Sequence, residues 1–329
     1  MKKSFILAAI AVIMAVASAY AQQIAVVSEG GETSVYQTFQ DAIEGADPGS
    51  VIYLPGGGFP IADSVKITKK LTIIGIGHKS NNDNVDGFTT ISGNLWFNEG
   101  SSGSAILGCY ITGDVNIGEG GASVNNVMVK CCNLNSVQVK NSTCMSTFVN
   151  QSFIRSTSEF GGSNPTISNN VLYTIGGVNG GKLYNNIVMG NYYLHVIAVS
   201  NSVINYNVFF RCRGGATNNG FCLGGGNQGT DNIFPYSSNE YASFDNKIIL
   251  GPDDSWNVVF VNYVGGINPM SDFHFSEAFQ QYSYIGIYGG TGFNDHQTAP
   301  VPYIVAKRID QETDAAGQLK IQVRVKAGN

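Results

Sequence analysis

The residues that could do chemistry in this sequence are few and scattered. Its one adjacent pair of acids, Asp253 and Asp254, lies in the run 251–255. Paired carboxylates can hydrolyse a glycosidic bond when one protonates the leaving group while the other activates water. The Pro252-Asp253-Asp254 run is also typical of a turn. We therefore keep both interpretations, a catalytic pair and a plain turn.

Two arginines lie beside a glycine-rich stretch, on either side of a cysteine. Arg211 and Arg213 are candidates for gripping an acidic sugar, with loop-edge cations as the simpler interpretation. The acids between residues 81 and 250 are widely spaced. No calcium cluster is visible among them, because such a site needs several carboxylates in reach of one ion.

Aromatic side chains offer a second kind of site, because sugar rings stack on them. Tyr192, Tyr193 and His195 lie in one short run, and Trp256 is a further candidate for carbohydrate binding. Trp96 and Phe210 belong to the same class. The alternative for each aromatic residue is a place in the core, where large rings are usually found.

Six cysteines need an explanation. Cys212 and Cys222 flank the glycine-rich stretch, so a disulfide between them would close that loop. Cys109 lies one repeat before Cys131 and Cys132, which favours stacked buried thiols. No histidine lies close in sequence to a cysteine pair, so we expect no zinc site and no other metal.

The first residues predict export. Lys2 and Lys3 precede an apolar run and a small-residue A-x-A site that ends at Ala21, which is the pattern of a cleaved signal peptide over residues 1–21. The apolar run is too short to span a bilayer. The net charge of −5 gives nucleic acid no attraction. We expect a secreted protein, periplasmic, extracellular or on the cell surface, with no membrane span.

The rest of the chain must supply the scaffold, and it is a repeat of short strands. A polar residue followed by two apolar ones recurs seven times, 16 to 25 residues apart, with glycine and asparagine between. These segments are 109–111, 132–134, 152–154, 170–172, 186–188, 207–209 and 232–234. Only 12% of residues are charged and 41 are glycine. This pattern predicts an all-β parallel β-helix, in which apolar columns form the core, glycine and asparagine turn the corners, and stacked asparagines hydrogen-bond along a ladder.

The two ends of the repeat differ from its middle. Apolar spacing over residues 35–46 predicts an amphipathic helix with Thr38 as its N-cap. Near the other end, strands at 303–309 and 319–326 predict a hairpin with a basic face of Lys320, Arg324 and Lys326. We divide the chain into a signal peptide, a β-helix domain with an N-terminal cap over residues 22–295, and a hairpin extension over 296–329.

The opening of the domain resembles that of pectin-lyase-like right-handed parallel β-helix proteins. The resemblance rests on residues 36–43, 49–54 and 67–75, which are similar to that superfamily's capping helix and first coil. Residues 272–275 and 285–290 resemble the last coil of secreted β-helix proteins from Gram-negative anaerobes. The superfamily contains polysaccharide-cleaving enzymes and non-catalytic adhesins, so the resemblance does not choose a function.

Two functions remain open. The first is non-catalytic binding of a polysaccharide or a cell-surface glycan. The second is a polysaccharide lyase or glycoside hydrolase acting on a uronate-containing chain, with Ca²⁺ as a cofactor only in the lyase case. The superfamily's hydrolase motifs, a G-H-G and an R-x-K on coils near paired aspartates, are absent from the repeat. We therefore favour binding.

Overall fold

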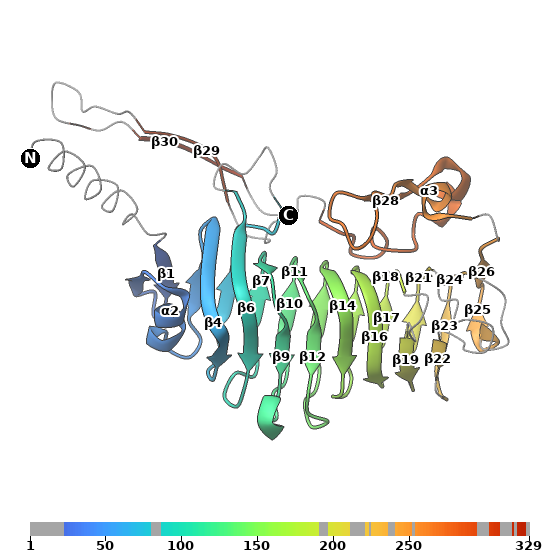
Figure 1. Ribbon diagram of the computed structural model, residues 1–329, viewed down its shortest axis with the longest axis horizontal. Coiled ribbons are helices and arrows are strands. Elements are labelled where there is room, and N and C mark those ends of the chain that lie inside the picture. Colours follow the sequence, from blue (N-terminus) through green and yellow to red (C-terminus); the bar gives the residue numbers. More distant parts are fainter. Residues whose placement is uncertain are drawn as a thin grey trace, which may run out of the picture.

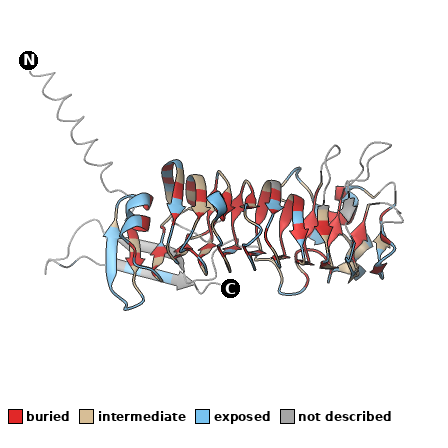
Figure 2. Cartoon of the chain, turned by 90° about the horizontal axis from the view of Figure 1, so that it is seen from below, coloured by how far each residue is buried: buried red, intermediate tan, exposed pale blue. Residues whose placement is uncertain are grey.

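The computed structural model is an elongated stack of β-coils (Figure 1). It describes residues 23–79, 87–190, 197–210, 221–223, 225–235, 241–251, 254–294, 303–309, 318 and 321–326. Most strands pair in parallel with strands of the preceding and following coil. The predicted all-β parallel β-helix is therefore confirmed. Figure 2 shows buried residues running along the inside of the whole stack.

The first face of the stack is a ten-stranded sheet. It starts with the antiparallel strands β1 (Ile24–Val27) and β2 (Thr33–Tyr36), and β3 pairs with β1. In the three-residue strands that follow, the middle residue points into the core and is buried. These parallel strands are β3 (Val51–Tyr53), β5 (Thr72–Ile74), β7 (Ala105–Leu107), β10 (Met128–Lys130), β13 (Phe148–Asn150), β15 (Thr166–Ser168), β17 (Lys182–Tyr184) and β20 (Val203–Asn205).

A fourteen-stranded sheet forms the second and third faces. Four long strands bend from the second face to the third: β4 (Gly57–Ile67), β6 (Thr89–Phe97), β14 (Phe153–Phe160) and β16 (Val171–Asn179). The second face also contains β8 (Tyr110–Ile111), β11 (Asn133–Leu134), β18 (Ile187–Val188), β21 (Val208–Phe209), β24 (Ile233–Phe234) and β26 (Ile248–Ile249). The third face also contains β9 (Val115–Ile117), β12 (Val137–Val139), β19 (Ile197–Ser200) and β22 (Phe221–Leu223).

The seven repeated segments of the sequence all lie in one column on the second face. Val171 pairs with Ile187, which pairs with Val208, which pairs with Ile233. One residue of each short strand points into the core and the other points outward, as alternation requires. The predicted repeat and its register are confirmed.

The residue before each of these strands forms a buried polar ladder. In the last four coils it is Asn170, Asn186, Asn207 and Asn232, none of which is exposed. Each Nδ2 donates to Oδ1 of the next asparagine, at 3.0, 2.9 and 3.1 Å. The same Oδ1 atoms accept the backbone N–H of the preceding asparagine. The predicted asparagine ladder is confirmed, and it satisfies turn groups that no water can reach.

In the earlier coils, thiols hold the same ladder position. Cys109 and Cys132 are fully buried on neighbouring coils, and the Cys132 Sγ donates to the carbonyl oxygen of Lys130 at 3.2 Å. Burial raises the pKa of Cys132 to about 12. The prediction of stacked buried thiols is confirmed. Cys212 lies outside the described residues, so its disulfide with Cys222 stays a prediction.

The corners between faces use left-handed backbone, as the composition predicts. Asn169 and Asn185 turn successive coils between the first and second faces, with φ of 54° and 56°. Asparagine tolerates this conformation better than most residues other than glycine. The αL turns leave these side chains pointing along the outside of the corner, where they bind another segment, as described below.

A helix is present near the start of the stack but is shorter than predicted. It is α2 (Phe39–Gly45), and Thr38 Oγ1 accepts the backbone N–H of Asp41 as an N-cap. Phe39 and Ile43 are buried against the first coils. The prediction that the helix begins at Val35 is wrong, because this residue lies in β2 and is 53% exposed.

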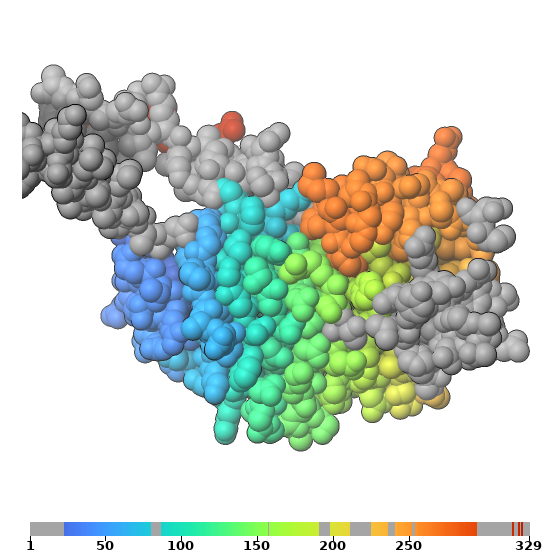
Figure 3. Space-filling view, viewed as in Figure 1, coloured from blue at the N-terminus to red at the C-terminus, as the bar shows by residue number. Residues whose placement is uncertain are grey.

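The coils end near β26, and residues 254–294 fold back over the second face; we call them the flanking segment. It contains α3 (Trp256–Val259), β27 (Phe260–Asn262), β28 (Asp272–Phe275) and η3 (Glu277–Tyr282), and β27 pairs antiparallel with β28. In Figure 3 it forms the orange layer over the green and yellow coils. The resemblance of 272–275 and 285–290 to a last coil is therefore misleading, because neither stretch joins the parallel sheets.

The flanking segment covers an apolar stripe that the repeat exposes. The outward residues of the second-face strands pack against its rings and branched side chains in a second apolar core. The stripe is Phe153, Val171, Ile187, Val208 and Ile233, all at most 1% exposed. Covering a contiguous stripe of this kind favours the folded state by roughly 25 cal/mol per Å² of apolar surface removed from water.

Hydrogen bonds from the corner side chains fix the last part of this segment along the stack axis. Asn185 Nδ2 donates to the carbonyl oxygen of Tyr284, and Asn169 Nδ2 donates to those of Ile287 and Gly289, at 2.8 to 2.9 Å. Gln151 Nε2, one coil earlier, donates to the carbonyl oxygen of Gly292 at 2.7 Å.

We expect Gly289→Ala to loosen the flanking segment. A Cβ at residue 289 would overlap the carbonyl oxygen of Tyr284 and the Nδ2 of Asn185, which bond to each other. The expected cost is about 2 kcal/mol of the free energy of unfolding, in the range of overpacked sites. Binding of a hydrophobic dye and the thermal midpoint are the measurements. Gly58→Ala is the control, because nothing lies within 4 Å of a Cβ there; equal effects in both variants would contradict the prediction.

The remaining described elements lie outside the coils. Strand β23 (Gly229–Thr230) pairs with β25 (Phe244–Asp245), and η1 (Glu119–Gly121) is a single 3₁₀ turn. Strands β29 (Tyr303–Ile309) and β30 (Ile321–Lys326) pair antiparallel, which confirms the C-terminal hairpin. The predicted signal peptide, residues 1–21, lies outside the described residues. Among those described, no helix has the length and apolar character needed to cross a bilayer.

Candidate functional site

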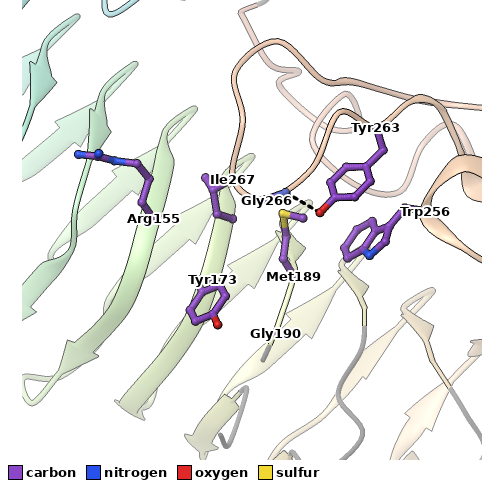
Figure 4. A pocket seen from close by; sticks show the side chains of 8 residues that line it. All are labelled: Arg155, Tyr173, Met189, Gly190, Trp256, Tyr263, Gly266 and Ile267. Atoms are coloured by element: carbon purple, nitrogen blue, oxygen red, sulfur yellow. Dashed lines mark hydrogen bonds between the residues drawn. The ribbon is translucent and has the colours of Figure 1, made fainter. Parts of the chain in front are cut away.

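A groove of about 510 Å³ lies between the coils and the flanking segment (Figure 4). It follows the corner between the second and third faces. The residues that line it come from three successive coils and from the first part of the flanking segment. They are Arg155, Tyr173, Met189, Gly190, Trp256, Tyr263, Gly266 and Ile267.

The coil wall of the groove is one column of the repeat. Arg155, Tyr173 and Met189 each directly follow a second-face pair, and the pairing of Ile154 with Leu172 and of Leu172 with Val188 places them side by side. Neighbouring strands are about 4.8 Å apart. The column therefore presents a cation, a phenol ring and a thioether at regular steps along the axis.

The opposite wall consists of stacked rings. The ring of Trp256 lies 3.7 Å from that of Phe210 and 4.8 Å from that of Tyr263, measured between centroids, with interplanar angles of 20° and 23°. The Tyr263 hydroxyl accepts the backbone N–H of Gly266 at 2.7 Å (Figure 4). This bond and the stack hold the rim of the groove in one conformation.

Arg155 is held firmly at one end of the groove. Its guanidinium donates to the carbonyl oxygens of Leu134 and Ile111 and to the hydroxyl of Tyr110, over whose ring it lies at 5.0 Å. It has no carboxylate partner among the described residues. Arg155 thus ties coils together and leaves a positive charge beside the groove.

The residues singled out in the sequence converge on this groove only in part. Trp256 lines it, but the residue is 6% exposed and its ring stacks on Phe210 and Tyr263, so the core interpretation accounts for most of its surface. Asp254 Oδ2 accepts the backbone N–H of Gly251 at 2.6 Å, as the turn interpretation requires. Asp253 lies outside the described residues.

The other candidates lie on two stretches that also lie outside the described residues. Tyr192, Tyr193 and His195 follow directly after Gly190, which lines the groove. Arg211 and Arg213 follow Phe210, which stacks under Trp256. Their roles stay predictions, but both stretches leave the coils at the groove.

A second pocket of about 230 Å³ contains a pair that sequence reasoning missed. His274 Nδ1 lies 2.7 Å from Asp272 Oδ1, and its imidazole stacks on the ring of Tyr288 at 3.7 Å. Lys79 lines the same pocket and donates to the carbonyl oxygen of Pro269. An Asp–His pair two residues apart on a strand gives a signal in the sequence, since both side chains then share a face.

Neither pocket has the composition of a metal site. Among the described residues, no three His, Cys, Asp or Glu side chains gather closely enough to hold an ion. The groove is therefore a neutral to cationic, ring-lined channel, suited to binding a ring-bearing ligand by contact and stacking. Comparison of the chain with protein-family models, with curated proteins and with solved structures finds no match.

Proposed function

We propose that this protein is a secreted β-helix that binds a polysaccharide or a cell-surface glycan in the groove beside Tyr173. The observation that carries the proposal is the composition of the groove: three aromatic rings and a thioether line it, with one arginine at its end. Sugar rings present C–H faces that pack on aromatic rings and hydroxyls that need planar polar partners. The groove offers the first along its walls and the second at its ends.

The groove favours binding over catalysis. Among the described residues that line it, none carries a carboxylate. Glycoside hydrolysis generally needs two carboxyl groups across the scissile bond. The paired acids of the sequence lie elsewhere: Asp254 closes a turn onto Gly251. The predicted signal peptide supports an extracellular glycan as the ligand.

The test is binding of the purified protein to a panel of neutral and uronate-containing polysaccharides, followed by affinity electrophoresis and calorimetry. Tyr173→Ala is expected to weaken binding about tenfold, the contribution of one ring contact. Tyr184→Ala, on the outside of the first face, is the matched control and should leave binding unchanged.

The same incubations distinguish the enzymatic alternative. New absorbance from unsaturated uronates that requires Ca²⁺ would indicate a lyase, and new reducing ends would indicate a hydrolase. Either result would overturn the binding proposal. Absence of any retained polysaccharide in the panel would overturn it as well.

A further inference from the structure

The outer surface of the third face carries a second arrangement of side chains that the groove does not use. One outward column on this face passes from coil to coil through Lys66, Trp96, Asn116, Gln138 and Glu159. Each of these residues pairs in register with the next. Strands of this face carry the labels β9, β12 and β22 in Figure 1.

Trp96 is the aromatic platform of this column. Unlike Trp256 it is partly exposed, and no aromatic ring stacks on it; the ammonium of Lys66 lies 5.7 Å from the centre of its ring. Its indole N–H makes no hydrogen bond within the described part of the chain. A ring in this setting is available to a ligand that has both an apolar face and hydrogen-bond acceptors.

The neighbouring amide gives an independent sign of a ligand. Asn116 is only 8% exposed, yet its side-chain amide makes no hydrogen bond with any described residue. Side chains that are buried to this degree are nearly always hydrogen-bonded, because an unpaired polar group costs about 1–3 kcal/mol. The next residue in the column, Gln138, presents a further amide, which donates to Ser136 Oγ.

We propose that the third face binds a neutral, extended polysaccharide parallel to the axis of the stack, with one sugar ring on Trp96 and the following units on Asn116 and Gln138. This proposal rests on the proposed function and names the class of its ligand. The roughly 4.8 Å spacing of the coils is close to the length of one sugar unit in an extended β-1,4-linked chain. Successive amides therefore meet successive sugars.

Charge favours a neutral chain over an acidic one. The described strands of this face and its edge present Lys66 and Lys140 against Asp114 and Glu159, so positive and negative charges balance. A polyanion would find no excess of cations along the column. The face also adjoins the groove, because β14 and β16 continue from Arg155 and Tyr173 into it.

Two tryptophans, Trp96 and Trp256, are the only ones in the chain, so fluorescence can report on each site separately. The probe is cellohexaose, with maltohexaose as a match of the same sugar and length but a curved chain. In Trp256→Phe, the emission of Trp96 should change with cellohexaose and not with maltohexaose. In this background Asn116→Leu should weaken the dissociation constant about tenfold, whereas Asn262→Leu, an exposed strand position elsewhere, should not.

The outcomes separate this inference from the proposed function. If Trp96 does not respond to cellohexaose while Tyr173→Ala weakens glycan binding, the third-face site is wrong and the groove stands. If Trp96 responds and Tyr173→Ala changes nothing, the third face is the site and the groove is not. An equal response to maltohexaose, or an unchanged affinity in Asn116→Leu, would overturn the extended-chain proposal.

Discussion

Asn186→Leu is expected to lower the free energy of unfolding by about 4 kcal/mol, although leucine has a similar volume. Asn186 Oδ1 accepts hydrogen bonds from the backbone N–H and the Nδ2 of Asn170. Its own Nδ2 donates to the carbonyl oxygen of Ile167 and to Oδ1 of Asn207. Leucine would leave these groups unpaired in a place that water does not reach, at about 1–3 kcal/mol for each buried group.

The loss should also be local in space. In a solenoid each coil contacts only its neighbours, so a broken ladder destabilises the coils on either side first. Hydrogen exchange should therefore rise in β16, β18 and β21 before it rises in the first coils. Denaturant unfolding gives the total, and Asn262→Leu, an exposed asparagine in β27, is the control.

A cost below about 1 kcal/mol in Asn186→Leu would show that the ladder is not a structural requirement. Exchange that rises equally in all coils would show that the stack unfolds as one unit. In either case the argument from stacked asparagines would fail, because it derives both effects from the same four hydrogen bonds.

The sequence predicts the stack well because each coil repeats the same physical problem. Every coil needs an inward apolar residue, a corner that tolerates positive φ and a donor for the buried turn. Asn170, Asn186, Asn207 and Asn232 supply that donor at one position, so their spacing predicts the register. The thiol of Cys132 fills the position in an earlier coil by the same rule.

The flanking segment could not be predicted, because nothing in it repeats. Its apolar residues, such as Phe260 and Phe273, match the outward stripe of the second face and not a pattern within the segment. The outward residues of that stripe are the one hint, since Val171, Ile187 and Val208 leave an apolar surface that needs a cover. Which part of the chain provides the cover is a tertiary question.

The candidate site was only half predictable for a related reason. Trp256 was identified by its type, but its stack on Phe210 joins residues 46 positions apart in the sequence and could not be anticipated. Arg155 and Tyr173 occupy an ordinary repeat position. They become a groove wall only because the flanking segment rises beside them.

Acid should destabilise this protein through one buried histidine, His78. The residue is 4% exposed, and neither ring nitrogen has a hydrogen-bond partner among the described residues. Burial, and to a smaller degree the charge of Lys79, lower the pKa of His78 from 6.5 to about 3. The imidazole is therefore neutral in the folded protein at pH values where it would be protonated in the unfolded chain.

The sign follows from proton uptake. Between about pH 6.5 and pH 3 the unfolded state binds a proton at His78 that the folded state does not bind, so falling pH favours unfolding. The contribution is complete above pH 6.5 and is lost as the pH falls, at about 1.4 kcal/mol for each unit. By pH 4 the expected loss is about 3 kcal/mol relative to pH 7.

His78→Leu isolates this effect from the titration of the carboxylates. Leucine preserves an apolar side chain beside Phe153, whose ring meets His78 edge-on at 5.8 Å. The free energies of unfolding of the two proteins, measured by denaturant at pH 7, 5.5 and 4, should diverge as the pH falls, with the variant losing less. Parallel curves would mean that His78 binds its proton in the folded protein at an ordinary pKa. That result would require a polar partner or an opening to solvent at this corner of the stack, where a closed apolar site explains the neutral ring.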